Sequence, residues 1–551
     1  MASPLLPQKT LQQQIFQSNF IPPFWSLKSL RFEMALLISS SMVVMSLMRN
    51  AMSMAMVAIV KNNVTSVDDQ DEFTMDWTGD EQARIHTAFY VGALLAVFPS
   101  EAITQRIGAK NLLSLSMLIN ILGSFLTPLL AIFLRNYLFV AGIRLVMGVG
   151  NGFIIPCGSV VISKWFPINE KSTAMAIFTT GNQLGIAASM LLTAKFCEVD
   201  FFGGWPLAFF AFGVFGTGFL LIWHFRAADK PRNSQFITAV ELEYIHGGKA
   251  RRRRANTVIR PTPYLKILLN GCVNAICLCS FAQSFVLVAL VTYLPKYYQI
   301  AMNMNLSKNG IWSAVPFASQ MITKLVFGIA ADRIKQRKVS VTIVTKASNA
   351  IASFGTAACI LIVCLLPIEQ TELIMFFMCS SMALFSAYVP GYNTSIVSVA
   401  PQFTAFISSY AQIYSQMAST LAPLVIGLLT KNGTVEEWNI SFYMLVCVLV
   451  FTGLAFQIFG HGRTEPWGET PSNATSVNLS TCLSTNPEDG SRRLSLDRHN
   501  SILRSDSGNN EPRKKKISRV SYKDDDVVML PSRMEDLEND VIYSIEEEHE
   551  D

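Results

Sequence analysis

Charged side chains are scarce in this chain. Asp, Glu, Lys and Arg together make up 15% of its 551 residues, whereas 51% are hydrophobic. A single soluble domain needs a hydrated and charged surface, so this composition argues against that class of protein. The length is ample for a dozen membrane crossings of about 20 apolar residues each, with loops between them.

Signatures of enzymes and of secreted proteins are also missing. The sequence has no phosphate-cradling glycine loop, no metal-ligand cluster and no nucleophile beside a base, so we expect neither an enzyme nor a metal or bound cofactor. The cysteines lie mostly within apolar stretches, which argues against a disulfide framework. No cleavable signal precedes Met34, and we expect the first apolar stretch to be an uncleaved anchor.

Twelve apolar stretches are long enough to cross a bilayer as helices. The predicted fold is an all-α membrane protein with two six-helix bundles, residues 34–225 and 268–458, joined by a basic linker over residues 226–267. A segment over residues 1–33 precedes them, and a tail over residues 459–551 follows. The predicted spans are 34–60, 85–103, 112–134, 138–161, 174–194, 205–225, 268–294, 310–331, 341–366, 373–396, 406–430 and 440–458.

The basic residues predict the topology, because short loops rich in Lys and Arg stay on the cytoplasmic side. The linker is the most basic loop, which places it and both termini in the cytoplasm. The acidic loop between the first two spans then faces the exterior or a vesicle lumen. Three glycosylation sequons, at Asn63, Asn305 and Asn432, fall on that same side.

The C-terminal tail has the composition of a disordered segment, with many Ser, Asn, Asp and Glu residues and basic clusters. Ser495 follows Arg492 and Arg493 in a pattern that basophilic kinases modify. We therefore expect the tail either to bind cytoplasmic kinases or adaptors or to be a plain solvated extension. We also expect the chain to contact the lipid bilayer and a small anionic solute, and to bind no nucleic acid.

Ionisable residues inside the predicted spans carry the functional signal: Arg49, His86, Arg144 and Lys324. A cation near the bilayer centre costs about 2.5 to 3.5 kcal/mol on insertion scales, so it normally faces a wet cavity, a partner or a ligand. Several such cations in one chain indicate a pathway for anions.

Span four reads Arg144-Leu-Val-Met-Gly148-Val-Gly150-Asn-Gly152, and its glycines allow close approach of a neighbouring helix. Gln105-Arg-Ile-Gly-Ala-Lys110 follows span two, and Ala331-Asp-Arg333 stands in the equivalent place of the second half. Together with the two sets of six spans, these motifs resemble those of the major facilitator superfamily. The resemblance implies two bundles that rock around a site at the membrane midplane.

Further motifs follow one another in a fixed order along the chain. They are Arg49-Asn-Ala-Met-Ser-Met-Ala-Met-Val57, Ile85-His-Thr-Ala-Phe-Tyr-Val-Gly92, Lys164-Trp-Phe-Pro167, Ser313-Ala-Val-Pro316, Ala400-Pro-Gln-Phe403 and Glu465-Pro-Trp467. Each motif is short, but the colinear set resembles the anion:cation symporters, the family of vesicular glutamate transporters, sialin and sodium-dependent phosphate transporters.

This resemblance implies that Arg49 binds an anionic group of the substrate and that His86 acts in binding or gating. A guanidinium pairs with carboxylate or phosphate through directed hydrogen bonds, and imidazole can change its charge near neutral pH. Plainer interpretations stay open: a buried structural pair for Arg49 and an interfacial histidine for His86. Arg144 is either a coupling residue or a partner of the internal gate.

Lys324 does not come from the resemblance. It lies in the middle of predicted span eight, beside Thr323, and we expect it to complement Arg49 from the opposite bundle as a second cation of an anion site. The alternative is that its long side chain snorkels toward the cytoplasmic interface.

Two departures from the family concern coupling. Relatives carry a glutamate in the span-four motif where this chain has Asn151, and an aspartate in span ten where it has Ser398. Neither replacement can titrate in the physiological range, so proton coupling through these positions is not available. Gln283 takes the place of an arginine that glutamate carriers show in span seven.

The sequence therefore predicts a transporter of organic anions or inorganic phosphate that works by alternating access. We expect it to depend on membrane potential or Na+ more than on H+, since the acidic groups are lost and the cations remain. The alternative is a non-transporting membrane sensor or scaffold that has kept the fold. We expect a plasma membrane or a lysosomal or vesicular location.

Overall fold

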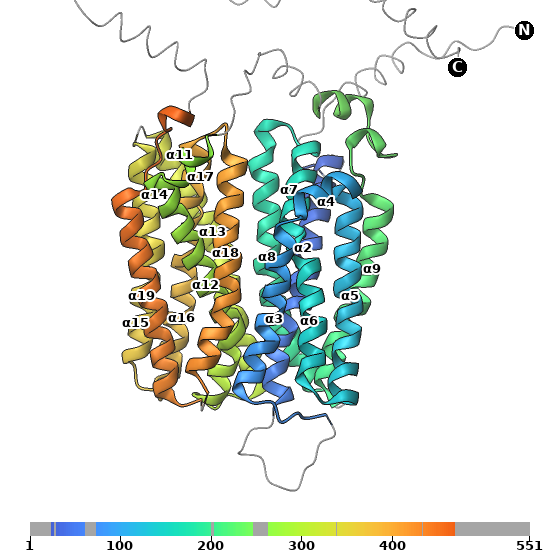
Figure 1. Cartoon of the computed structure of the whole chain (residues 1–551), viewed down its shortest axis with the longest axis vertical. Coiled ribbons are helices and arrows are strands. Elements are labelled where there is room, and N and C mark those ends of the chain that lie inside the picture. The colour runs from blue at the N-terminus through green and yellow to red at the C-terminus, as the bar shows by residue number, and fades with distance from the viewer. Residues whose placement is uncertain are drawn as a thin grey trace, which may run out of the picture. The chain divides into compact units, whose positions relative to one another are not determined.

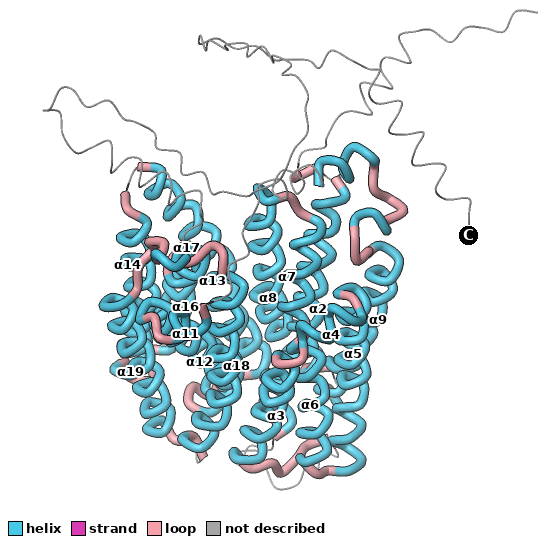
Figure 2. Tube along the Cα trace, turned by 45° about the horizontal axis from the view of Figure 1, so that its top comes forward, coloured by secondary structure: helices cyan, strands magenta, loops and turns pink. Residues whose placement is uncertain are grey.

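The computed structural model describes residues 24–26, 29–60, 73–199, 203–245, 263–337, 339–431 and 433–468. This part of the chain is helical throughout apart from turns, short connections and one isolated bridge between Val60 and Met75 (Figure 2). The predicted all-α fold is confirmed. The sequons at Asn63 and Asn432, Ser495 and nearly all of the C-terminal tail lie outside the described residues.

The helices form two groups that lie side by side (Figure 1). The N-terminal bundle consists of α2 (Leu30–Ile59), α3 (Gly79–Val97), α4 (Ser100–Ile107), α5 (Ala109–Leu134), α6 (Tyr137–Gly152), α7 (Ile154–Trp165), α8 (Ile168–Cys197) and α9 (Trp205–Arg226). The C-terminal bundle consists of α11 (Tyr264–Leu268), α12 (Gly271–Ile300), α13 (Leu306–Gln336), α14 (Val341–Ala350), η3 (Ile351–Gly355), α15 (Thr356–Leu365), α16 (Thr371–Phe385), η4 (Ser386–Tyr388), α17 (Tyr392–Val399), α18 (Thr404–Leu429) and α19 (Val435–Phe459). Short 3-10 turns occur at η2 (Pro231–Asn233) and η5 (Pro466–Gly468).

Ten of the described helices, counting contiguous pieces as one, are long and apolar enough to cross a membrane. The pair α3 and α4, bent by 65°, adds an eleventh. The remaining helix, α18, corresponds to the eleventh predicted span; it has 26 residues but carries polar side chains such as Gln412 and Gln416. It packs between α12 of its own bundle and α3 of the other, so its polar residues lie along the bundle interface.

Helix α3 packs closely against α6 because both helices carry glycine at the crossing. A Cβ atom added to Gly148 would lie 1.8 Å from the backbone oxygen of Phe89, and one added to Gly92 would lie 2.0 Å from that of Leu145. Real Cβ atoms never come so near to a backbone oxygen, so larger residues would push the helices apart. This crossing fixes the position of Arg144, which lies one turn before Gly148.

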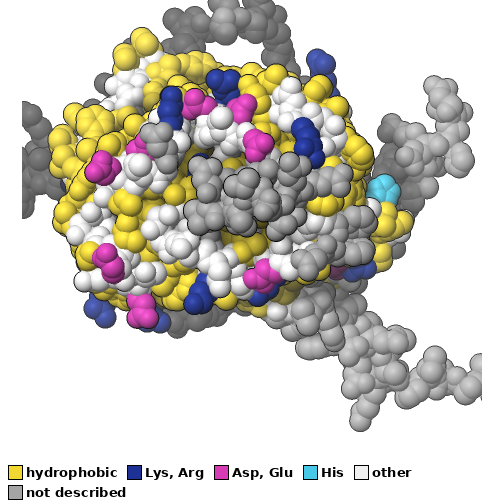
Figure 3. All heavy atoms as spheres, turned by 90° about the horizontal axis from the view of Figure 1, so that it is seen from below, with side chains coloured by type: hydrophobic (Ala, Val, Ile, Leu, Met, Phe, Trp, Pro, Cys, Tyr) yellow, Lys and Arg dark blue, Asp and Glu magenta, His cyan; other side chains and the backbone are white. Residues whose placement is uncertain are grey.

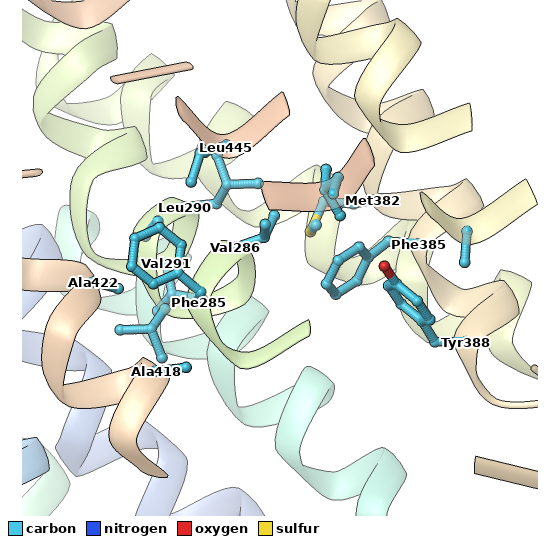
Figure 4. Close-up of a cluster of buried hydrophobic side chains, with 14 of the residues drawn as sticks. Phe285, Val286, Leu290, Val291, Met382, Phe385, Tyr388, Ala418, Ala422 and Leu445 are labelled. Carbon is cyan, nitrogen blue, oxygen red and sulfur yellow. The ribbon is translucent and has the colours of Figure 1, made fainter. Parts of the chain in front are cut away.

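Buried apolar side chains form two clusters, which correspond largely to the two bundles. In the C-terminal bundle, Val286 of α12 lies toward Met382 and Phe385 of α16, whereas Phe285 of α12 lies toward Ala418 and Ala422 of α18 (Figure 4). That cluster continues into the N-terminal bundle, where Phe89, Tyr90 and Met190 belong to it. The two bundles therefore share apolar contacts at their interface.

We call the end of the molecule that carries the linker the linker end, and the opposite end, where α2 stops and α3 begins, the far end.

The first part of the linker is bound to the N-terminal bundle. Asp229 accepts hydrogen bonds from the backbone N–H of Ala109 at the start of α5 (3.0 Å) and from Lys164 Nζ (2.6 Å). Partial burial raises the pKa of Asp229, but these hydrogen bonds outweigh it, so the pKa lies below its ordinary value.

The start of α2 is capped in the same way by Glu241 of the linker. Its carboxylate accepts from Ser29 Oγ (3.0 Å) and from Arg31 Nε (2.9 Å), and Arg31 also pairs with Glu170 of α8. After α19 the chain continues to Gly468 against the C-terminal bundle, where the N–H of Glu465 donates to the backbone oxygen of Val399. Described structure thus extends beyond residue 459, where the tail was predicted to begin.

At the far end the bundles touch. Gly427 of α18 packs on Ala83 of α3, and Gly310 of α13 packs on Ala194 of α8. Lys431 lies 3.7 Å from Asp80 across the same junction. Acidic and basic side chains are interspersed with apolar ones on this end (Figure 3). Asn305, the described sequon residue, is exposed here and caps α13 by accepting a hydrogen bond from the N–H of Lys308.

Candidate anion site between the bundles

Arg49 of α2 points to α8 of the same bundle. Its Nη2 donates a hydrogen bond to Asn182 Oδ1 at 2.7 Å, and the same oxygen accepts from Ser46 Oγ at 2.8 Å. The Arg49 Nε atom is buried and has no hydrogen-bond partner among the described residues. Asn182 thus orients the guanidinium but leaves part of its hydrogen-bonding capacity unused.

Arg144 of α6 lies directly beside Arg49. It is 2% exposed, and its Nη2 donates to the backbone oxygen of Arg49 at 3.0 Å. Its guanidinium carbon lies 4.7 Å from the ring centre of Phe89, a cation–π contact. Its Nε and Nη1 find no partner in the described structure. These contacts are with α2 and α3 of the same bundle.

Lys324 of α13 reaches across to the N-terminal bundle. Its Nζ donates to Thr179 Oγ1 of α8 at 2.9 Å, and its side chain is half-buried. Thr179 and Asn182 are three residues apart, so they lie on the same face of α8. The structure therefore brings Lys324 and Arg49 to one turn of α8 from opposite bundles.

His86 of α3 lies nearer the far end. It is 4% exposed, and its ring centre lies 6.3 Å from that of Tyr293 on α12. It lines a cavity of about 30 Å³ together with Gln82, Lys296 and residues of α2. His86 therefore lies between the two bundles, against α12 of the other bundle.

Lys296 is a site residue that the sequence analysis missed. Its Nζ donates to Gln82 Oε1 of the other bundle at 2.9 Å. The predicted span seven ended at residue 294, whereas α12 continues to Ile300 through Pro295. An intramembrane-cation search over the longer helix would have found it.

The two residues assigned to coupling lie apart from this cluster. Asn151 is seven residues after Arg144, two turns closer to the linker end on α6. Ser398 donates to the backbone oxygen of Thr394, and its own backbone oxygen accepts from Thr464, so it belongs to the linker end of the C-terminal bundle. Gln283 accepts a hydrogen bond from the Tyr392 hydroxyl, and both residues belong to the C-terminal bundle.

The cluster is strongly cationic. Within the described residues, no carboxylate lies within 4.0 Å of the charged nitrogen atoms of Arg49, Arg144, Lys296 or Lys324. Their partners are neutral oxygen atoms and one aromatic ring. Arg144 is buried and the other three cations are half-buried. Cations withdrawn from water without a counterion are costly, so this arrangement favours an anion as the missing partner.

Comparison with known proteins identifies the family. The model of the Major Facilitator Superfamily matches residues 38–423. The chain belongs to this superfamily. It is 32% identical over 395 residues to the transporter slc-17.3 of Caenorhabditis elegans, covering 71% of this chain and 73% of that protein. A putative inorganic phosphate cotransporter of Drosophila ananassae is 25% identical over 464 residues, with 80% of this chain and 94% of the relative covered.

The same comparison confirms the resemblance of this superfamily member to the anion:cation symporters. Human sialin is 24% identical over 458 residues, 80% of this chain and 91% of sialin, and a zebrafish vesicular glutamate transporter 3 is 26% identical over 439 residues, 77% of this chain and 72% of that protein. The protein is therefore an integral, multi-pass membrane transporter and not an enzyme.

Solved structures agree on the fold. The inward-open xylose transporter of E. coli superposes with a TM-score of 0.61 at 12% identity, covering 81% of this chain and 99% of that one. A bacterial homologue of the lysosomal transporter Spinster, in an inward-facing state, gives 0.60 at 16% identity, covering 80% and 100%.

Proposed function

We propose that this transporter carries a small anion, an organic anion or inorganic phosphate, and that Arg49, Arg144 and Lys324 bind its charged group. The observation that carries the proposal is the approach of Arg49 and Lys324 to one turn of α8 from opposite bundles, where no carboxylate of the described residues forms an ion pair with either cation. An anion held by both cations is in contact with both moving halves, as alternating access requires.

Relatives support the substrate class. Among them are proteins named as inorganic phosphate cotransporters, sialin and vesicular glutamate transporter, and these names refer to anions or to anion carriers. Carboxylate and phosphate both accept directed hydrogen bonds from a guanidinium, so the site chemistry suits either group. The sensor alternative loses weight because the family consists of transporters.

The same proposal includes the driving force for transport. Asn151 and Ser398 carry no titratable group, so membrane potential or Na+ is the proposed driver in place of H+. One elementary charge moving across about 100 mV gains about 2.3 kcal/mol, which is enough to concentrate an anion many-fold. Glycosylation at Asn63, Asn305 and Asn432, and binding of kinases or adaptors by the tail, remain further parts of this proposal.

The decisive experiment is uptake into liposomes that contain the purified chain. Labelled phosphate, glutamate, sialic acid, urate and ATP are offered in turn, with potential, Na+ and pH gradients imposed separately. We expect saturable uptake of at least one anion, and a loss of about tenfold or more in Arg49→Ala, which removes charge-assisted hydrogen bonds.

Arg84→Ala is the matched control. This arginine lies on α3 in an exposed position and donates to the Tyr137 hydroxyl at 3.0 Å, away from the site. Arg84→Ala also removes an arginine side chain from the N-terminal bundle, but at an exposed position away from the site. Uptake should therefore stay within about twofold of the native chain. Folded protein that takes up none of the five anions under any gradient would contradict the proposed function.

A further inference from the structure

The cavity at the far end lies between the bundles, on the side of the arginine pair that faces away from the linker. Ser53 and Val57 of α2, Gln82 and His86 of α3, and Thr292 and Lys296 of α12 are among the residues that line it. His86 precedes Phe89 by three residues on α3, and Arg144 lies over the Phe89 ring. One helical turn of α3 therefore separates this cavity from the arginine pair.

Lys296 brings an ammonium group to the cavity, and not all of its N–H donors have hydrogen-bond partners among the described residues. Its ammonium group has three N–H donors, and the structure gives it one partner among the described residues, the neutral Gln82 Oε1. The Gln82 amide is held in place because its Nε2 donates to the backbone oxygen of Trp77 at 2.8 Å. With His86 on the same cavity, two basic groups face a space that no described carboxylate neutralises.

The Lys296–Gln82 hydrogen bond joins the two bundles. The neighbouring Gln299 Nε2 makes a second cross-bundle contact, to the backbone oxygen of Val57 at 3.0 Å. Parting of the bundles at the far end must break both bonds. Gln82 is neutral, so Lys296 gives up little when it exchanges this partner for the charged oxygen of an anion.

We propose that Lys296, together with His86, forms a second anion site at the far end, which holds the charged group of the transported anion when the bundles part there, and that the Lys296–Gln82 hydrogen bond replaces the anion when this gate closes. The proposal rests on the proposed function. The anion passes from Lys296 to Arg144 and Arg49, one turn of α3 deeper, and the ammonium group returns to Gln82. Lys296 is thus a binding residue and a gate residue in turn.

The test separates the charge of Lys296 from its hydrogen bond. Lys296→Gln keeps an N–H donor for Gln82 but removes the charge. Uptake of labelled phosphate and the other four anions is measured below saturation, in the liposomes described above. We expect uptake of the transported anion to fall about tenfold or more, the loss of one charge-assisted hydrogen bond.

A charge-rescue measurement complements it. In Lys296→Cys, a cationic aminoethyl methanethiosulfonate restores a positive group through a mixed disulfide, whereas the methyl and sulfonatoethyl reagents add a neutral or an anionic group. We expect only the aminoethyl reagent to restore uptake, to within about threefold of the native chain. A merely structural lysine would not respond to the sign of the added charge. The native chain with each reagent controls for its own cysteines, and Lys308→Gln, at an exposed far-end lysine outside the cavity, controls for lost surface charge.

The outcomes are distinct. If the native chain and Lys308→Gln transport an anion and Lys296→Gln transports it equally well, the second site is overturned while the proposed function stands. Rescue by all three reagents alike overturns it in the same way. If the native chain transports none of the five anions, the proposed function fails and the second site fails with it.

Discussion

Arg144 Nη2 donates a hydrogen bond to the backbone oxygen of Arg49, 3.0 Å away, so one cation supports the helix segment that carries the other. Two guanidinium groups held near each other repel unless an anion or a polar group lies between them. Asn182 supplies one polar group, and the buried nitrogen atoms without partners leave room for more. The pair is thus arranged for a ligand that both arginines can share.

Substitution of Asn182 by a charged residue tests whether Arg49 binds the anion. Asn182→Asp places a carboxylate 2.7 Å from Arg49 Nη2, where it neutralises the guanidinium and competes with the substrate. We expect its KM for the transported anion to rise about tenfold or more, and that of Asn182→Ala, which only frees the guanidinium, to change less. Uptake titrations of both variants make the measurement. An Asp variant no worse than the Ala variant would exclude Arg49 from anion binding.

Lys324→Gln removes the cation contributed by the C-terminal bundle. We expect a KM for the anion that is about tenfold higher, since one charge-assisted hydrogen bond is lost, with little change in protein yield. Lys346→Gln is the matched control, because Lys346 donates to the backbone oxygen of Gln457 within the C-terminal bundle. Equal effects of the two substitutions would indicate a structural lysine at position 324.

Asn151 determines the coupling ion in our proposal. With the potential clamped, we expect an imposed pH gradient to cause no accumulation of the anion by the native chain, because neither Asn151 nor Ser398 titrates. Asn151→Glu restores a titratable group, and we expect accumulation of up to about tenfold per pH unit, the limit for one coupled proton. Asn151→Gln serves as the neutral control. Accumulation by the native chain under the clamped pH gradient would refute the prediction.

The ion pair of Asp229 with Lys164 at the linker end contributes to the stability of the fold. Its pKa in the folded protein is lowered, so its stabilising contribution is present above the ordinary carboxyl pKa of about 3.9 and is lost as the pH falls through the folded value. We expect Asp229→Asn to lower the free energy of unfolding by about 1 kcal/mol at neutral pH, since Lys164 loses its ion pair. Thermal unfolding in detergent at neutral and acid pH measures it, and the difference between variant and native chain should shrink as the pH falls below the ordinary carboxyl pKa.

The all-helical fold and much of the site could be predicted from the sequence. Apolar length identified the spans, and the cost of intramembrane charge singled out Arg49, Arg144 and Lys324, which the structure does bring together. That reasoning needs only local composition. The order of the spans placed Arg49 and Arg144 in the first bundle and Lys324 in the second, which is why Lys324 was expected to complement Arg49 from the opposite bundle.

Lys296 and Asn182 could not be found in this way, for different physical reasons. Pro295 and the charge at position 296 ended the predicted span, yet the helix continues, and Asn309 Nδ2 donates to the backbone oxygen of Pro295 at 2.7 Å. A proline inside a membrane helix is tolerated where neighbours satisfy the backbone. Asn182 is one of several polar residues on α8, and only the packing of α2 on α8 reveals which one meets Arg49.

The positions of Thr179 and Asn182 on α8 favour a cargo that offers more than one acceptor atom. Lys324 and Arg49 arrive about one helical turn apart, roughly 5 Å along the helix axis. A polyatomic anion with several acceptor oxygens can bind both cations at once and hold α13 to α8, whereas a monatomic ion binds one of them and leaves the bundles uncoupled. A ligand can drive a conformational change only through a difference in affinity between two states. We therefore expect polyatomic anions to be transported and small halides to bind without being transported.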